Sequence, residues 1–215
     1  MMSLIDGRNT KRLIENYLYL TNNESDKRFY LTSNQSEIID NLDCNLNNII
    51  FKERQTGISS LLCAWSVVQA IYSDKNNPEH IVIMSCNWIC TQLLQEKIVK
   101  FIQMIPNFVW GVSIDEKLFK KCTKQKIELF NGTVFTFMPS GSNNFIGLKE
   151  PTIIINDTGM IAGCEYNSDA SAFTSLIKSS MNKDKLRTVF IVESGIGNHK
   201  SKISLATEKC GMWQE

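Results

Sequence analysis

The chain has 215 residues and a mass of 24.5 kDa, which at about 100–200 residues per domain allows one domain with at most a small appendage. Apolar residues make up 43% and charged residues 21%, so a sizeable core is possible and wholesale disorder is excluded. The 23 Lys and Arg nearly cancel the 22 Asp and Glu. A formal charge of +1 gives no global basic field for nucleic acid, so any such contact must come from local patches.

No apolar stretch reaches the roughly 18 residues that a membrane span needs, and residues 1–7 carry no signal-peptide pattern. We therefore expect a cytoplasmic protein that does not contact membranes. The seven cysteines lie mostly inside apolar runs, which suits reduced, buried thiols better than a disulfide framework. The two histidines, His80 and His199, are far apart, and no zinc site is expected because such a site needs four ligands at recognisable spacing.

Residues 1–47 are polar and rich in Asn, with an apolar segment over 13–20 and an expected turn over 21–27. From residue 48 onward, short apolar runs alternate with segments of helical apolar spacing. Strands are predicted at 49–51, 80–84, 126–130, 133–138, 152–155 and 187–192, and helices at 59–72, 88–105 and 170–181. Asn131-Gly132 separates two of the strands and is a strong hairpin signal. The alternation predicts an α/β domain with a mainly parallel sheet and helices on both faces.

One loop between a predicted strand and helix has an unusual composition, Lys52-Glu53-Arg54-Gln55-Thr56-Gly57-Ile58-Ser59-Ser60. Such loops bind ligands in α/β sheets, and a helix N-terminus offers N–H groups and a positive dipole end to anions. Against the phosphate-cradle pattern GxxxxGK[ST], the second glycine and the magnesium-binding hydroxyl are present, but Lys52 replaces the first glycine and Ile58 the usual lysine. A glycine turn before a serine-capped helix explains the loop alone better. The two cations at its start weigh against that interpretation, because core packing needs neither.

KERQTGISSLL resembles the phosphate loop of large terminase subunits, the ATP-driven motors that pump viral DNA into capsids. Many of these have a loop K-x-R-Q-x-G-x-S-T, in which the cation comes from the start. Other motifs occur in a similar order, namely segments 15–20 and 29–31, Asn34-Gln35, Asn131-Gly132-Thr133 with Gly147-Leu148, the strand TIIIND at 152–157, and IVES at 191–194. The resemblance extends over about residues 13–198 and rests on motif order more than on any single motif.

The resemblance implies a RecA-like P-loop ATPase core over 48–198, an N-terminal segment with an adenine-side motif over 1–47, and a tail or linker over 199–215. It implies ATP and Mg²⁺ as cofactors. Gln35 would read adenine, and Asp157 would position the attacking water. Glu193 with Ser194 would couple nucleotide state to domain movement. Metal contacts would come from Ser59, Asn156 and Asp157. The phosphates would be held by Lys52, Arg54, Gln55, Thr56, Gly57, Ile58, Ser59 and Ser60.

Three departures from the family pattern concern hydrolysis. Asn156 stands where the first of two acids is usual, Ile146 where an arginine often precedes Gly-Leu, and Gly195 where the coupling motif continues Ser-Thr-Pro. Two alternatives therefore stay open, a nucleotide-binding or structural paralogue with weakened hydrolysis and a helicase-type RecA domain. Asp157 could also be an exposed helix cap after a buried strand.

Partners implied by the resemblance are double-stranded DNA, the portal or procapsid, the small terminase subunit and further copies in a ring on the capsid, in the host cytoplasm. Family members also carry a C-terminal nuclease domain of ribonuclease-H type. Only about 20 residues follow Ser194, too few for a domain, so we expect no nuclease activity. The lysine-rich run over 117–126 is interpreted as a solvated face, with phosphate-backbone contact as the second interpretation.

Overall fold

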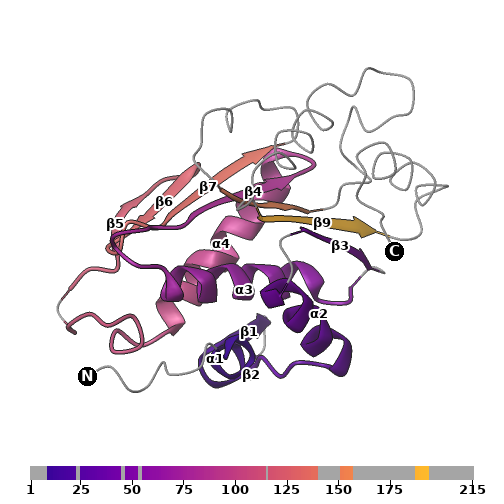
Figure 1. Ribbon diagram of the computed structural model, residues 1–215, viewed down its shortest axis with the longest axis horizontal. Helices are drawn as coiled ribbons and strands as arrows, with labels where there is room; N and C mark the ends of the chain where they lie inside the picture. Colours follow the sequence, from indigo (N-terminus) through magenta and orange to yellow (C-terminus); the bar gives the residue numbers. More distant parts are fainter. Residues whose placement is uncertain are drawn as a thin grey trace. The chain divides into compact units, whose positions relative to one another are not determined.

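The computed structural model describes residues 9–22, 25–44, 47–52, 55–114, 116–139, 151–156 and 187–193 (Figure 1). The chain divides into two compact units. Unit 1 comprises Met1–Cys44, Gly57–Glu79 and Leu93–Val134, and unit 2 comprises Asn45–Thr56, His80–Gln92 and Phe135–Glu215. The predicted helix at 170–181 lies outside the described residues. The predicted division of the chain after residues 47 and 198 stays a prediction.

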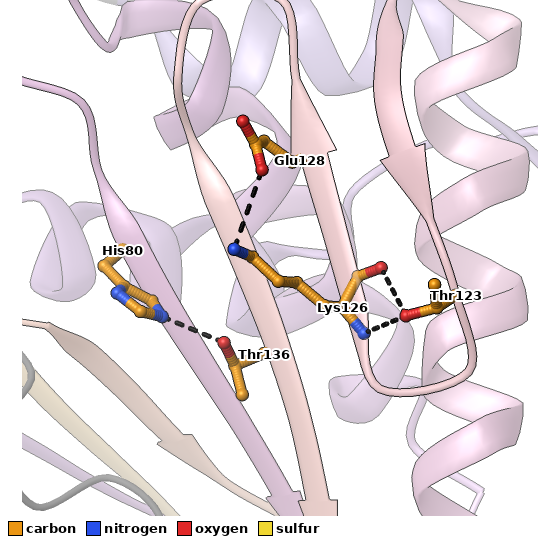
Figure 2. A network of polar contacts seen from close by, with 5 residues as sticks. All are labelled: His80, Thr123, Lys126, Glu128 and Thr136. Atoms are coloured by element: carbon orange, nitrogen blue, oxygen red, sulfur yellow. Dashed lines mark hydrogen bonds and ion pairs between the residues drawn. The ribbon is translucent and has the colours of Figure 1, made fainter.

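Unit 2 is built on parallel strands. In the order of the sheet they are β3 (Asn47–Lys52), β9 (Arg187–Glu193), β8 (Thr152–Ile155) and β4 (His80–Ser85), with β7 (Val134–Pro139) beside β4. The β3–β9, β8–β9 and β4–β8 pairs are parallel, which confirms the predicted mainly parallel sheet in this unit. All four residues of β8 are buried, as expected for a strand with neighbours on both sides. At the start of β4, the His80 ring lies 2.9 Å from the Thr136 hydroxyl (Figure 2).

In unit 1, two helices pack against one buried helix. α3 (Ile58–Tyr72) buries residues on nearly all of its faces, and both α1 (Thr10–Tyr17) and α2 (Ser33–Cys44) contact it. A helix that is apolar all round belongs inside a core. α4 (Trp88–Met104) confirms the predicted amphipathic helix and ends just before Pro106. Its buried positions recur at helical spacing, at Thr91, Leu94, Gln95, Ile98, Phe101 and Ile102.

Unit 1 also contains short antiparallel pairs. Over 21–27, where a turn is expected, the chain extends into β1 (Tyr19–Asn22) and β2 (Ser25–Arg28), which are paired from Tyr19↔Arg28 to Asn22↔Ser25. β5 (Phe119–Cys122) pairs with β6 (Lys126–Leu129) across a register shift. Most lysines of the 117–126 run are exposed there, in line with a solvated face. Lys126 lies 3.6 Å from Glu128, and its backbone bonds to Thr123 (Figure 2).

The turn after β6 is built by the Asn-Gly-Thr motif. Leu129 N donates to Thr133 O at 2.9 Å, and Gly132 has a φ of 88°, which favours glycine. The Asn131 side chain is 5% exposed and donates to Ala70 O, near the end of α3, at 2.8 Å. The predicted turn is thus confirmed, and its asparagine also fixes the last turn of the central helix.

Of the helices that the structure describes, none combines the length and the apolar character needed to cross a membrane. The described cysteines, at 44, 63, 86, 90 and 122, form no disulfide bonds.

Candidate functional site

The predicted phosphate loop begins at the end of β3 and continues into α3. Lys52 is the last residue of β3 and is half-buried, while Gln55, Thr56 and Gly57 are exposed. Ile58 is buried and starts α3, followed by the half-buried Ser59 and Ser60. Arg54, Asp157 and Ser194 lie outside the described residues, and of Glu193 only the backbone is described. The strand, loop and helix around the motif are therefore where the sequence predicts them.

The backbone of this loop is left-handed at two positions. Gln55 has a φ of 63° and Gly57 a φ of 75°. A positive φ is uncommon for a residue with a side chain, and such strain is found preferentially at functional sites. Turns of this kind direct backbone N–H groups to one side and form anion-binding concavities.

The first turn of α3 has no side-chain cap. Its N-cap residue is Gly57, and neither a capping side chain nor an acidic residue is present in that turn. Leu61 N donates along the helix to Gly57 O at 3.0 Å. The alternative of a serine-capped helix is therefore wrong. Neither the N-cap side chain nor an acidic residue of this turn offsets the positive end of the helix dipole, so the turn can accept an anion.

Gln35 lies against this turn. Thr32 and Gln35 form a capping box at the start of α2, in which Gln35 Oε1 accepts from Thr32 N at 3.2 Å and Thr32 Oγ1 accepts from Gln35 N at 3.2 Å. The Gln35 side chain is thereby fixed, and the residue is 8% exposed. A Cβ placed on Gly57 would lie 3.1 Å from Gln35 Nε2. Two of the predicted site residues, 22 positions apart in sequence, thus meet within unit 1.

A lysine that the sequence analysis does not single out contacts the same turn. Lys97, on α4, donates from Nζ to Ser60 Oγ at 2.7 Å. Its positive charge also affects the pKa of the Cys63 thiol, one turn further along α3. Burial raises the pKa of the Cys63 thiol to about 12, and the nearby charge of Lys97 opposes this rise. A buried, protonated thiol is a poor nucleophile, so Cys63 has a core role. No sequence signal marks Lys97, because the contact joins residues 37 positions apart.

Several predicted residues of unit 2 stand at the carboxyl edge of its parallel strands. Lys52 and Glu193 are register partners at the ends of β3 and β9. Asn156 directly follows β8, is 4% exposed and donates from its backbone N to Met84 O, near the end of β4, at 2.8 Å. Ligands in α/β sheets bind outside this edge. The position that the family resemblance assigns to a metal-side acid is thus a buried amide.

A second polar group is buried at the same edge. Ser85 ends β4 and is fully buried, and in the described part of the chain its hydroxyl has no hydrogen-bond partner. An unsatisfied buried hydroxyl costs about 1–3 kcal/mol and calls for an explanation such as a bound water or ligand. Ser85 was not predicted from the sequence as a site residue, although its place at the end of a buried strand could have marked it.

Comparisons of the sequence with protein families and with curated proteins give no match. The structure is similar to the crystal structure of the HK97 bacteriophage large terminase, with a TM-score of 0.65 and 14% sequence identity. The match covers 94% of this chain and 40% of that chain, so the chain spans well under half of the terminase's length. This likeness shows a mixed α/β fold of the terminase type.

Proposed function

We propose that the chain is a RecA-like ATPase domain of a large terminase subunit and uses ATP hydrolysis to drive double-stranded DNA into a capsid. The observation that carries the proposal is the first turn of α3. It is uncapped, follows a left-handed glycine, and lies against a buried glutamine and a lysine, in a chain whose fold is similar to a large terminase. A helix N-terminus of this kind suits a phosphate group.

In unit 1, Gly57 and the backbone N–H groups of Ile58 and Ser59 would hold phosphate oxygens, and Gln35 would read the adenine. The small distance between Gln35 Nε2 and Gly57 supports this pairing of roles, because base and phosphates of one nucleotide must be within reach together. The capping box supports it further, since a fixed amide loses little freedom on binding.

In unit 2, Lys52 would contribute the cation that Ile58 does not supply. Arg54 would add to the positive charge at the start of the loop. β9 lies between β3 and β8 in the sheet, and its last residue, Glu193, is the register partner of Lys52. A shift of the loop would therefore reach the coupling motif, Glu193 with Ser194, through directly hydrogen-bonded strands. This arrangement supports a motor that links nucleotide state to movement.

Ser59 and Asn156 carry oxygen atoms, the ligand type that Mg²⁺ prefers directly or through its waters. Bound Mg²⁺ would spread the charge that develops on the phosphoryl oxygens. Asn156 offers an oxygen without a charge, so the ion would be held less firmly than between two acids, and Asp157 alone would orient the attacking water. We therefore propose slow intrinsic hydrolysis. The burial of Asn156 favours the weakened paralogue over the helicase alternative as the second candidate.

The proposal is tested by measuring both binding and turnover of ATP by the purified chain. A fluorescent ATP analogue should bind in the presence of Mg²⁺ and be displaced by ATP, and phosphate release should be slow but above the protein-free rate. Addition of procapsids bearing the portal, together with duplex DNA, should stimulate release. Binding without any release under all conditions would establish the non-hydrolysing paralogue. Absence of nucleotide binding would overturn the proposal.

A further inference from the structure

We infer that Lys97, on α4, is a second phosphate-binding cation of the site at the start of α3 and favours nucleotides with a β- and γ-phosphate over the nucleoside. This inference rests on the proposed ATP site and adds to it a residue from outside the loop. The sequence resemblance assigns the charge at this site to the loop alone, at Lys52 and Arg54.

The contact between Lys97 and the turn is direct. Its Nζ donates to Ser60 Oγ at 2.7 Å, and both residues belong to unit 1. Ser60 is the third residue of α3, within the turn whose N-cap residue, Gly57, provides no side-chain cap. An ammonium group has three N–H donors, and Ser60 takes one of them. Lys97 is therefore held at the turn while still able to donate to an oxygen anion.

The positive charge of Lys97 lies near the positive end of the α3 dipole, which is unfavourable unless an anion is bound there. The N-terminus of a helix carries roughly half a positive charge, and cations are stabilising at the opposite end. No acidic residue lies in the first turn of α3. Within the described ranges, no carboxylate forms an ion pair with Lys97. Among the described residues, two sources of positive potential thus meet without a counter-charge, and an anionic ligand would supply one.

A purely structural tether would not need a lysine. A serine hydroxyl in a helix can be satisfied by a backbone carbonyl one turn back, as Ser66 is by Cys63 O at 2.8 Å. Holding a lysine in one conformation costs side-chain entropy of about 2 kcal/mol. The loop also lacks a lysine at Ile58, directly before Ser59, where phosphate cradles usually carry one. Lys97 brings a cation from another helix to Ser60, two residues after that position.

The test compares Lys97→Gln with Lys100→Ala. Lys97→Gln removes the charge but keeps a donor for Ser60. Lys100→Ala removes an exposed lysine three residues further along the same helix. Affinities for ATP, ADP and adenosine are measured by calorimetry, and folding is checked by thermal unfolding. Lys97→Gln should weaken ATP binding by about 10- to 100-fold, the range for a lost charge-assisted hydrogen bond, and leave adenosine binding within twofold of the parent. Lys100→Ala should bind ATP within twofold of the parent.

Three other results would each be decisive. If the parent binds no ATP, the proposed function and this inference fail together. If the parent binds ATP and Lys97→Gln binds it equally well, only the inference fails. If Lys97→Gln weakens ATP and adenosine by the same factor, Lys97 is a tether between α3 and α4. Lys97→Arg, which keeps the charge, covers the case in which the glutamine variant does not fold, and it should retain most of the preference for ATP over adenosine.

Discussion

The start of α3 in unit 1 and the strand ends of unit 2 differ in the kind of group they present. The α3 turn gathers a left-handed glycine, an uncapped helix end and the ammonium of Lys97, all features that favour an anion. In the part of the strand edge that is described, the buried polar groups at the ends of β8 and β4 are an amide, Asn156, and a hydroxyl, Ser85. Among the described residues, the features that favour an anion at the α3 turn are thus stronger than those that would support hydrolysis at the strand edge.

Under the proposed function, this difference predicts that nucleotide affinity and the rate of hydrolysis can be changed separately in this chain. A phosphate needs only N–H groups and cations, whereas hydrolysis also needs a placed metal ion and an oriented water. Substitutions at the α3 turn should therefore change nucleotide affinity, and substitutions at the strand edge should change the rate.

The largest effect is expected at the strand edge. Asp157→Asn should lower the rate of ATP hydrolysis by about 100-fold or more, the contribution of a positioned carboxylate, with little change in ATP affinity. Asn156→Asp should instead raise the rate by up to about tenfold at limiting Mg²⁺, because a carboxylate holds the ion more firmly. Steady-state phosphate release across a Mg²⁺ titration measures both. If both variants match the parent, the end of β8 is not catalytic and the non-hydrolysing paralogue is the better description.

The next largest effect concerns Lys52. Lys52→Ala should weaken ATP binding by about 10- to 100-fold, because a charge-assisted hydrogen bond to a phosphate oxygen is lost. Lys149→Ala removes the same charge outside the loop and should bind ATP like the parent. Equilibrium binding of a fluorescent ATP analogue provides the comparison. If Lys52→Ala and Lys149→Ala bind the analogue equally well, the positive charge that holds the phosphates comes from residues other than Lys52.

A moderate effect is expected at Gly57. Gly57→Ala and Gly111→Ala both place a Cβ at a left-handed backbone, with φ values of 75° and 69°, and each should lower the free energy of unfolding by about 1–2 kcal/mol. Only the Cβ at Gly57 meets a neighbour, Gln35 Nε2 at 3.1 Å, while that at Gly111 meets nothing within 4 Å. Gly57→Ala should therefore also weaken ATP binding. Unfolding by denaturant and nucleotide binding are measured on both variants. If Gly57→Ala binds ATP with the same affinity as the parent, Gln35 is not part of the nucleotide site.

The smallest effect is expected on replacing two buried serines, Ser66 and Ser85. Ser66 Oγ donates to Cys63 O at 2.8 Å, whereas Ser85 Oγ has no partner among the described residues. Ser66→Ala should cost about 0.5–1.5 kcal/mol in the free energy of unfolding, and Ser85→Ala should be neutral or slightly stabilising. The free energies of unfolding of the two variants, measured with denaturant, test this expected difference. A loss of 1 kcal/mol or more in Ser85→Ala would indicate, on the same scale, that a bound water satisfies the hydroxyl.

The elements that could be predicted from the sequence are those with a strong apolar period. The strands β3, β4, β8 and β9 and the helices α3 and α4 agree with their predicted ranges to within a few residues. α2 was missed because its sequence, SNQSEIIDNLDC, has little apolar content. Its start is instead marked by the capping box of Thr32 and Gln35, a signal that the pattern T-x-x-Q carries. β5 was missed because FKKC is polar, and its pairing with β6 forms it.

For the candidate site, the sequence predicted the loop but not its surroundings. The position of Gly57 before a helix followed from local pattern. The contact of Lys97 with Ser60 depends on how α4 packs against α3, and a lysine on an exposed-looking face gives no sign of it. The approach of Gln35 to Gly57 was likewise expected only from the family resemblance.

The bond from Asn131 to Ala70 O has a mechanical consequence. α3 is held near its first turn by the side chain of Lys97 and near its last by the turn after β6. Because α3 is attached near both ends, it cannot shift along its axis without disturbing one of these attachments. Any displacement of its first turn must either carry the β6 turn along or break a buried hydrogen bond, at a cost of about 1–3 kcal/mol. The helix would thus transmit a push over its 15 residues, about 22 Å at 1.5 Å per residue, to the far side of unit 1.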